Sequence, residues 1–303
     1  MEGRRGLLPE GAGSPADLAH LLGSADYLAD TGVATAAYLA LALPRPLFLE
    51  GEAGVGKTSL AHALAQLLDA PLLRLQCYEG IDASQALYDW DFPRQLMHLR
   101  AAESAGPVDA ATVEEEVYSR RFLLSRPLLA ALETTPSVLL IDEVDRADDE
   151  FEAFLLEVLS DYTVTVPELG TVRAEVPPVV VVTSNRTREV HDALKRRCLY
   201  HWVEHPSFER EVAIVRRRVP EASAQLAAQV ASAVAVLRQQ DLQKPPGVAE
   251  SIDWTLALVA LGAPRLDADT ATATLGAVLK YREDVELARK LDVGVLLDRA
   301  LSG

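Results

Sequence analysis

The chain has 303 residues, of which 49% are hydrophobic and 24% are charged, a balance that is typical of a globular protein and excludes a disordered or fibrous one. Its formal net charge of −16 repels phosphate backbones and anionic lipids, so nonspecific binding to nucleic acids or membranes is disfavoured. The two cysteines have no paired spacing, which excludes a disulfide framework and leads us to expect a reducing, cytoplasmic location.

The N-terminal segment predicts neither a targeting signal nor a membrane span. Residues 1–13 carry two arginines but no apolar segment behind them. The apolar run from Val33 to Leu43 is too short to cross a bilayer. We expect a helical lead-in before the first strand.

Short apolar runs followed by turn residues predict buried parallel strands. Three are strong and two are weaker, and helical patterns lie between them. This alternation predicts an α/β fold in which a parallel sheet is covered by helices on both faces. The strong runs are 46–50, 138–141 and 179–183, and the weaker ones are 71–77 and 199–203.

A complete P-loop motif follows the first predicted strand and precedes a helical segment, which are the two contexts that the motif requires. Its glycines let backbone N–H groups cradle phosphates, and a helix N-terminus adds a favourable dipole. Lys57 supplies charge to the β- and γ-phosphates, and the Thr58 hydroxyl binds Mg²⁺. A Gly-rich turn that binds nothing is disfavoured. The residues expected to hold ATP are Gly51, Glu52, Ala53, Gly54, Val55, Gly56, Lys57, Thr58 and Ser59.

Residues 78–122 form a longer connection than a crossover between strands requires, so we expect an insertion there. Its large side chains either contact a protein client or pack against the domain, and packing is favoured. These side chains are Tyr88, Trp90, Phe92, Met97 and Tyr118.

Two adjacent carboxylates, Asp142 and Glu143, end the strand 138–141 at the edge where open α/β sheets bind ligands. Asp142 is expected to hold the Mg²⁺ shell, while Glu143 polarises the attacking water. The alternative is an acidic, solvated turn, since more carboxylates follow between residues 145 and 150. The P-loop makes the catalytic interpretation the stronger one.

The next segment predicts a helix with an acidic first turn, then a β-hairpin that projects from the domain, formed by residues 163–166 and 171–176. A polar amide, Asn185, then ends the strand 179–183 and is expected to reach the γ-phosphate or the attacking water. Taken alone, an asparagine such as Asn185 is more often an ordinary turn residue.

Cys198, His201 and His205 have a spacing superficially like that of metal ligands. Residues three apart on a strand point to opposite faces, and no fourth ligand is evident, so we favour core packing and hydrogen bonding for these side chains. Beyond residue 206 helical patterns take over, broken at 245–247 and 262–265. We expect an ATPase core over 1–206 and a small all-helical lid of four or five helices over 207–303.

The order of P-loop, Asp142-Glu143, Asn185 and helical lid resembles an AAA+ ATPase. The segment Leu47–Thr58, the hairpin and the Arg196-Arg197-Cys198 segment resemble the MoxR branch. Within that branch, Leu75–Gly80 is similar to ATPases encoded with carbon monoxide dehydrogenase and related molybdenum hydroxylases.

This resemblance implies roles for further positions. Asn185 corresponds to the sensor-1 residue, and the hairpin from Val164 to Val176 to the pre-sensor-1 insertion. Arg197 corresponds to an arginine finger that reaches the γ-phosphate of a neighbouring subunit, with Arg196 as the other candidate. Without the resemblance, both arginines fit a basic helix C-terminus. A finger supplied by a neighbour requires a head-to-tail ring, and the resemblance implies a hexamer.

The chain departs from that family at the second sensor, usually an arginine early in a lid helix. The corresponding stretch is Gly247-Val248-Ala249-Glu250-Ser251, which contains no arginine. No sensor-2 residue is therefore assigned, and which group replaces it stays open.

The leading hypothesis is an ATPase that binds ATP and Mg²⁺ and remodels a protein client. The resemblance implies a metalloenzyme client undergoing cofactor assembly and a partner with a von Willebrand factor A domain. A nucleic-acid motor and a small-molecule P-loop kinase are the alternatives, and the acidity of the chain argues against the motor.

Overall fold

The computed structural model describes residues 7–105 and 116–291, which divide into two compact units. The second unit contains the short segments Asp26–Leu28 and Gly51–Lys57 together with the chain from Trp202 onward, and the first contains the other described residues. The expected domain boundary after residue 206 stays a prediction, because a compact unit is not by itself a domain that folds alone.

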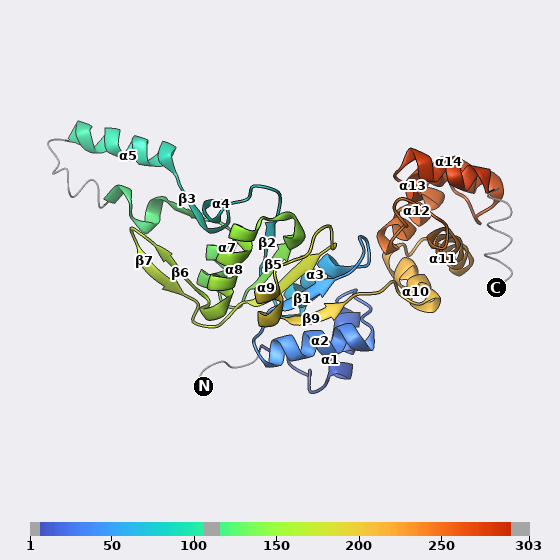
Figure 1. The fold of residues 1–303 in the computed structure, drawn as a ribbon, viewed down its shortest axis with the longest axis horizontal. Coiled ribbons are helices and arrows are strands. Elements are labelled where there is room, and N and C mark those ends of the chain that lie inside the picture. Colours follow the sequence, from blue (N-terminus) through green and yellow to red (C-terminus); the bar gives the residue numbers. More distant parts are fainter. Residues whose placement is uncertain (1–6, 106–115, 292–303) are drawn as a thin grey trace. The chain divides into compact units, whose positions relative to one another are not determined.

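A five-stranded sheet forms the centre of the first unit (Figure 1). Neighbouring strands pair in parallel from β2 to β5, from β5 to β8 and from β8 to β1, and β9 lies beside β1. All five predicted strands are confirmed. Their bounds are β1 (Leu47–Glu50), β2 (Leu72–Gln76), β5 (Val138–Asp142), β8 (Val179–Ser184) and β9 (Leu199–Trp202).

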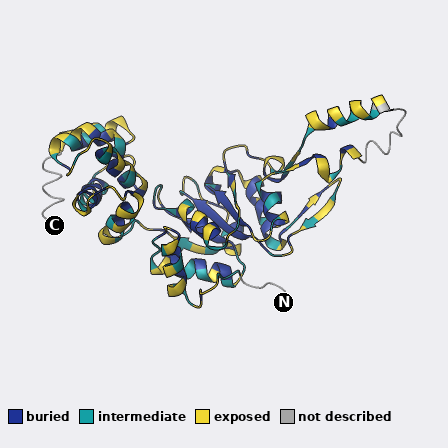
Figure 2. Ribbon diagram, turned by 180° about the vertical axis from the view of Figure 1, so that it is seen from behind, coloured by how far each residue is buried: buried dark blue, intermediate teal, exposed yellow. Residues whose placement is uncertain are grey.

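The three inner strands β5, β8 and β1 are buried along their whole length (Figure 2). β8 begins with four valines, whose branched side chains suit a strand covered on both faces. The register pairs Gln76 with Asp142 and Glu50 with Ser184. The C-terminal ends of these strands therefore meet at one edge of the sheet, where their last side chains are polar.

Helices flank the sheet, as predicted (Figure 1). α2 contacts β1, and α7 contacts β2 and β5. α8 begins where the Asp148 carboxylate accepts a hydrogen bond from the Phe151 N–H, and it buries one apolar face that joins the core of the sheet. The bounds are α1 (Pro15–Ser24), α2 (Thr31–Ala42), α3 (Lys57–Leu67), α7 (Pro127–Glu133), α8 (Asp149–Asp161) and α9 (Asp192–Arg197).

The connection after β2 contains α4 (Ala83–Leu87), β3 (Tyr88–Trp90), α5 (Phe92–Ala105) and η1 (Arg120–Phe122), and β3 pairs with β4 (Leu123–Ser125). Its residues 106–115 lie outside the described part. Trp90 packs edge-on against Tyr118, with ring centroids 5.3 Å apart. Phe92 and Met97 are 61% and 72% exposed, so for these two side chains the expectation of packing is wrong. α5 extends away from the sheet (Figure 1). Among the residues of α5 whose burial is described, Gln95 alone is buried.

The predicted hairpin is formed by β6 (Thr163–Val166) and β7 (Gly170–Arg173). Its second strand is shorter than the expected 171–176, because Arg173 pairs with Thr163, the first residue of β6, and helix α8 precedes that residue. Val164 and Val166 are buried, whereas the turn at Pro167 and Glu168 is exposed. The hairpin is thus anchored by one apolar face and presents its turn to solvent.

The second unit is helical, apart from its two short segments and the first residues after β9. The breaks predicted at 245–247 and 262–265 separate helices as expected, and residues 292–303 lie outside the described part. None of the helices in the described ranges is long and apolar enough to cross a bilayer. The bounds are α10 (Phe208–Arg218), α11 (Ala224–Arg238), α12 (Val248–Ala260), α13 (Ala268–Val278) and α14 (Arg282–Lys290).

Candidate ATPase site

The P-loop runs from the end of β1 to the first residue of α3. Gly54 and Gly56 have φ angles of 79° and 97°, in the left-handed region that favours glycine. A Cβ on Gly51 would lie 2.4 Å from the Val203 carbonyl oxygen, so a larger residue does not fit there. The buried Lys57 donates from Nζ to the Gly51 and Glu52 carbonyl oxygens, each at 2.6 Å. Its ammonium is therefore held inside the loop that should cradle the phosphates.

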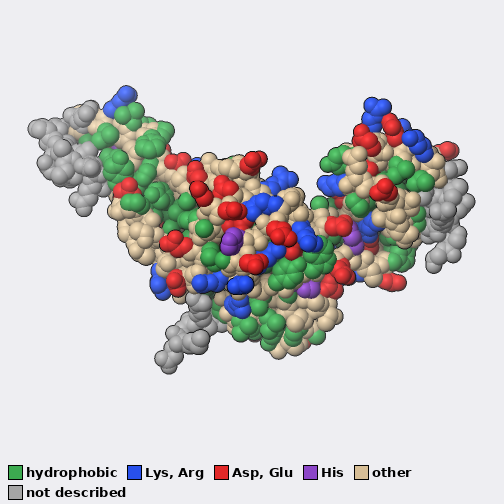
Figure 3. Space-filling view, in the orientation of Figure 1, with side chains coloured by type: hydrophobic (Ala, Val, Ile, Leu, Met, Phe, Trp, Pro, Cys, Tyr) green, Lys and Arg blue, Asp and Glu red, His purple; other side chains and the backbone are tan. Residues whose placement is uncertain are grey.

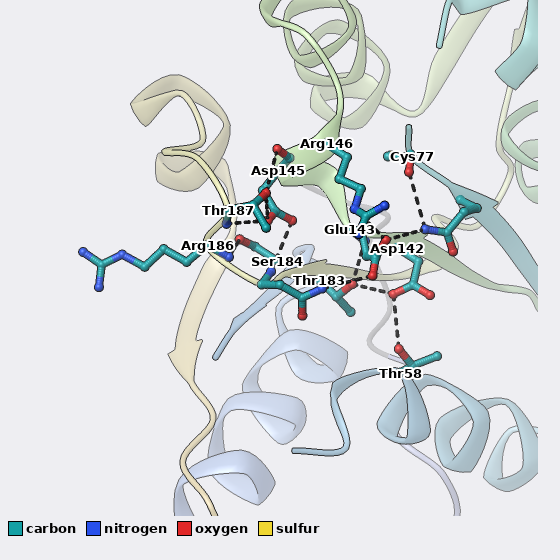
Figure 4. Close-up of polar contacts among 12 residues, drawn as sticks. Thr58, Cys77, Asp142, Glu143, Asp145, Arg146, Thr183, Ser184, Arg186 and Thr187 are labelled. Carbon is teal, nitrogen blue, oxygen red and sulfur yellow. Dashed lines mark hydrogen bonds and ion pairs between the residues drawn. The ribbon is translucent and has the colours of Figure 1, made fainter. Parts of the chain in front are cut away.

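Asp142 ends the buried strand β5 and accepts hydrogen bonds on both carboxylate oxygens. Figure 4 shows the bonds from Thr58 and Thr183. Oδ1 accepts from Thr58 Oγ1 at 3.2 Å and from Thr183 Oγ1 at 2.6 Å. Oδ2 accepts from Arg74, at 3.0 Å from Nε and 2.6 Å from Nη2. The two predicted metal ligands thus lie side by side at the edge of the sheet.

The spacing of these two oxygens suits Mg²⁺. An octahedral magnesium ion holds oxygen ligands at about 2.1 Å, which places adjacent ligands about 3 Å apart. The Thr58 hydroxyl and Asp142 Oδ1 are 3.2 Å apart, and both are the hard oxygen donors that Mg²⁺ prefers. Arg74 binds the other oxygen of Asp142, so Oδ1 is the atom that faces Thr58.

Glu143 follows Asp142 in a left-handed conformation, with φ of 55° and ψ of 51°. Its backbone N–H donates to Thr183 Oγ1 at 2.9 Å, and Oε1 accepts from Asn185 Nδ2 at 3.0 Å. Oε2 accepts from Gln76 Nε2 at 3.0 Å and lies 3.1 Å from Arg146 Nε. The turn after β5 therefore directs the Glu143 carboxylate toward Asn185 and Gln76.

Cys77 follows β2 and is a buried, free cysteine close to these carboxylates. Burial, followed by the nearby carboxylates of Asp142, Asp145, Glu143 and Glu152, raises the pKa of its thiol to about 12. Burial also raises the pKa of the Cys198 thiol to about 12. Both thiols therefore stay protonated at neutral pH.

Sequence reasoning missed four side chains that contact the two carboxylates: Arg74, Gln76, Arg146 and Thr183. Arg74 and Gln76 belong to β2, and the sheet order places β2 beside β5. Thr183 is the polar residue that follows the valines of β8, and this change in polarity was a usable signal. Among the other predicted P-loop residues, Val55 is buried, whereas Glu52 and Ser59 are exposed.

Arg196 and Arg197 end the short helix α9, and both are exposed. Within the described residues, no hydrogen bond or ion pair joins either side chain to Asp142, Glu143 or Asn185. Arg45 instead holds their backbone, because its guanidinium donates to the Arg196, Arg197 and Cys198 carbonyl oxygens at 3.0 to 3.3 Å. The end of α9 is therefore fixed while its two arginine side chains remain accessible.

Cys198, His201 and His205 have different surroundings. The Cys198 thiol is buried in the core and donates to the Leu194 carbonyl oxygen at 3.3 Å. His201 lies beside Gly32, and His205 Nε2 lies 2.9 Å from Glu52 Oε2. Among the residues that the structure describes, no three His, Cys, Asp or Glu side chains form a group suited to a metal ion.

A parallel sheet with a P-loop and a pair of carboxylates at its C-terminal edge defines a P-loop ATPase. Residues 46–198 match the family described as AAA domain (dynein-related subfamily), and the chain belongs to that family. This membership implies ATP hydrolysis. A comparison with curated proteins gives no match.

The chain is similar to several solved structures of the Thermotoga maritima RuvB Holliday junction branch migration motor. One is 17% identical with a TM-score of 0.45, and covers 81% of this chain and 66% of that chain. A variant of the motor is 15% identical with a TM-score of 0.48, and covers 90% of this chain and 72% of that chain. Another variant is 17% identical with a TM-score of 0.48, and the match covers 86% of this chain and 72% of that chain. The chain spans about two thirds of the length of these proteins.

Proposed function

We propose that this ATPase works as a ring of like subunits and uses ATP hydrolysis to change the conformation of a protein client. The main support for ATP hydrolysis is the hydrogen bond between Asn185 and Glu143, together with the hydrogen bond between Thr58 and Asp142. Thr58 and Asp142 hold Mg²⁺, Lys57 binds the phosphates, and Glu143 orients and activates the attacking water. Asn185 acts as the sensor of the γ-phosphate.

Arg197 is proposed to act on the nucleotide of a neighbouring subunit, with Arg196 as the other candidate. Support comes from the exposed side chains at the end of α9 and from the Arg45 contacts that fix their backbone. An arginine supplied across an interface stabilises transition-state charge and raises the rate by about 10³ or more. A finger used in this way requires a closed head-to-tail ring, for which we propose six subunits.

Mixing two inactive variants tests this arrangement. Subunits with Arg197→Ala keep the P-loop, and subunits with Lys57→Ala keep the finger, so a mixed ring contains some complete sites. We expect each variant alone to be inactive and the mixture to recover part of the ATPase rate. The same mixture with Arg196→Ala identifies which arginine is the finger. If no mixture recovers activity although both variants assemble, the finger is not supplied across the interface.

The client is proposed to be a protein, and the resemblance to MoxR-type ATPases suggests an enzyme that receives a metal cofactor, with a von Willebrand factor A domain protein as partner. Support comes from the acidity of the chain and from apolar side chains exposed on α5, namely Phe92, Leu96 and Met97. Figure 3 shows hydrophobic side chains gathered over this helix. The exposed turn of the β6–β7 hairpin is a second surface that the cycle can move.

A trapping experiment tests for the client. Glu143→Gln should hold ATP without hydrolysing it, so a client that binds the ATP state should copurify in ATP and be released in ADP. Lys57→Ala, which should not hold ATP, is the control. Replacing both Phe92 and Met97 by Ser should weaken capture, whereas Leu261→Ser, which alters an exposed leucine in the other unit, should not. Equal capture in ATP and ADP would argue against remodelling driven by nucleotide.

DNA binding measured across salt concentrations separates this function from a nucleic-acid motor. The net charge of −16 predicts no binding even at low salt. A steep loss of DNA affinity as salt rises would favour the motor. The ATPase rate per subunit, measured across protein concentrations, separates this function from that of a small-molecule kinase. The rate per subunit should rise as a ring assembles, whereas that of a monomeric kinase should stay constant.

A further inference from the structure

We propose that Asp145 is a positioning residue for ATP hydrolysis, which holds Asn185 in contact with Glu143. The inference rests on the roles proposed above for Asn185 and Glu143. It concerns a carboxylate that touches neither the Thr58 and Asp142 pair nor Glu143, and that acts through the backbone of the segment after β8.

Asp145 lies in the short helix η2 (Val144–Arg146) and is 2% exposed. Its Oδ1 accepts from the Asn185 N–H at 3.2 Å. Its Oδ2 accepts from the Thr187 N–H at 2.8 Å and from Thr187 Oγ1 at 2.7 Å. One buried side chain therefore satisfies three donors of a segment some 40 residues further along the chain (Figure 4).

The segment held by Asp145 has an uncommon backbone. Arg186 lies between the two anchored residues with a φ of 58°, a left-handed conformation that is strained for a non-glycine residue. Its own N–H donates to Ser184 Oγ at 3.0 Å. Three successive N–H groups are thus bound to side chains, which keeps this turn in one conformation. Figure 4 shows the Arg186 side chain extending away from Asp142 and Glu143.

This turn determines where the Asn185 amide lies. Asn185 Nδ2 donates to Glu143 Oε1 at 3.0 Å while its own N–H is held by Asp145. Glu143 and Asp145 are two residues apart and both follow β5, so the same short segment presents the carboxylate and holds its amide partner. A displacement of about 1 Å at a reacting group can reduce a rate about 100-fold, which makes such an anchor matter for turnover.

A second carboxylate holds the rest of the segment independently. Glu152, which is 1% exposed, accepts from the His191 N–H at 2.7 Å and is paired with Arg188, which also donates from Nε to the Ala147 carbonyl oxygen at 3.0 Å. Because these contacts do not involve Asp145, its loss should disturb residues 185–187 without releasing α9. The fold should therefore survive changes at Asp145.

The test uses Asp145→Asn, which keeps the shape of the side chain but replaces one acceptor oxygen with a donor that cannot pair with an N–H. Asp148→Asn is the matched control, because this nearby carboxylate is exposed and accepts from the N–H of Phe151, in its own helix. Thr187→Val removes only the hydrogen bonds of the Thr187 hydroxyl to Asp145, and Thr187→Ser keeps a hydroxyl that can form them. For each variant, kcat, the Kd for ATP with Mg²⁺ and Tm are measured, and Asp145→Asn is also combined with Asn185→Ala.

We expect Asp145→Asn to lower kcat about ten- to 100-fold with less than about a two-fold change in the Kd for ATP. Thr187→Val should lower kcat by less, Thr187→Ser should restore it, and Asp148→Asn should leave it unchanged. In the Asn185→Ala background, Asp145→Asn should cause no further loss of kcat, because its effect passes through Asn185. If Asp145→Asn does not fold, the comparison of Thr187→Val with Thr187→Ser tests the same inference.

Two results would overturn the inference. One is a wild-type kcat for Asp145→Asn or, where that variant does not fold, for Thr187→Val. The other concerns the Asn185→Ala background. If Asp145→Asn, or Thr187→Val in its place, lowers kcat there by the same factor as in the wild type, its effect does not pass through Asn185. Neither result argues against the proposed catalytic site if Asn185→Ala and Glu143→Gln hydrolyse ATP more slowly than the wild type. Full activity in those two variants would instead remove the proposed site.

Discussion

Thr183 links the two carboxylate residues through a single hydroxyl. It donates to Asp142 Oδ1 at 2.6 Å and accepts from the Glu143 N–H at 2.9 Å, while the residue is 1% exposed. Since a hydroxyl has only one proton, the direction of both bonds is fixed. The group therefore orients Asp142 and the turn that carries Glu143 at the same time.

Replacing Thr183 by Val should remove this hydroxyl while keeping the branched shape that suits β8. The buried Asp142 carboxylate and the Glu143 N–H then lose a partner, so we expect the free energy of unfolding to fall by about 1–3 kcal/mol. Thr183→Ser, which keeps the hydroxyl, should lose less. Urea unfolding of both variants measures the difference, and a Val variant at least as stable as the Ser variant would show that the hydroxyl is dispensable.

The two cysteines should be unreactive in the folded protein. Burial raises both thiol pKa values from 9.0 to about 12, so below pH 9 the folded protein contains almost no thiolate. Between pH 9 and about 12 the unfolded chain loses thiol protons that the folded chain keeps, so the free energy of unfolding should fall as pH rises through that window. Alkylation just below pH 9 should be slow in buffer and fast in urea. Rapid alkylation of either thiol in the folded protein would contradict this.

At the scale of elements, the C-terminus of helix α9 is bound by a side chain from outside the helix. Arg45 precedes β1 in the chain and donates to three successive carbonyl oxygens at the C-terminus of α9. Such carbonyls have no partner inside a helix, so a side-chain donor stabilises the helix end. The contact ties the proposed finger helix to the strand that leads into the P-loop.

Arg45→Ala should release the end of α9. We expect the free energy of unfolding to fall by about 1–3 kcal/mol and hydrogen exchange to rise at residues 196–198. Arg282→Ala, which removes an exposed arginine of α14, is the control and should change stability by less than about 0.5 kcal/mol. Unchanged exchange at residues 196–198 would mean that the Arg45 contacts do not hold this end of the helix.

Elements with a strong local signal could be predicted from the sequence, and the reasons for the misses are physical. The P-loop, Asp142, Glu143 and Asn185 follow buried strands, so each is recognisable from its own neighbours along the chain. Arg74 and Gln76 were not recognisable, because only the sheet order places β2 beside β5. The exposure of Phe92 and Met97 depends on how far α5 extends from the sheet, which no local pattern records.

At the scale of the whole molecule, the P-loop segment Gly51–Lys57 groups with the helical unit. The N–H groups of Val248 and Ala249, at the start of α12, donate to the Gly54 carbonyl oxygen at 3.1 and 3.3 Å. A Cβ on Gly247 would lie 2.7 Å from the Ala53 carbonyl oxygen. Where the resemblance predicts a sensor arginine, the helix start therefore contacts the P-loop through its backbone.

Gly247→Ala should separate these two backbones. The added methyl group clashes with the Ala53 carbonyl oxygen and the Gly54 Cα, so we expect a lower Tm and weaker ATP binding. Gly276→Ala in α13 is the control, because a Cβ there meets no atom within 4 Å and alanine favours a helix. It should leave ATP binding unchanged and raise Tm slightly. Wild-type ATP affinity in Gly247→Ala would show that the contact does not shape the P-loop.

The central claim is that Glu143 activates the water that attacks an ATP held with Mg²⁺ by the P-loop, Thr58 and Asp142. Binding and turnover of ATP, measured with and without Mg²⁺ on the wild type and on Glu143→Gln, test it most directly. Both proteins should bind ATP in a magnesium-dependent way, and only the wild type should release phosphate. Phosphate release by Glu143→Gln at the wild-type rate, or the absence of magnesium-dependent binding in both, would contradict the account.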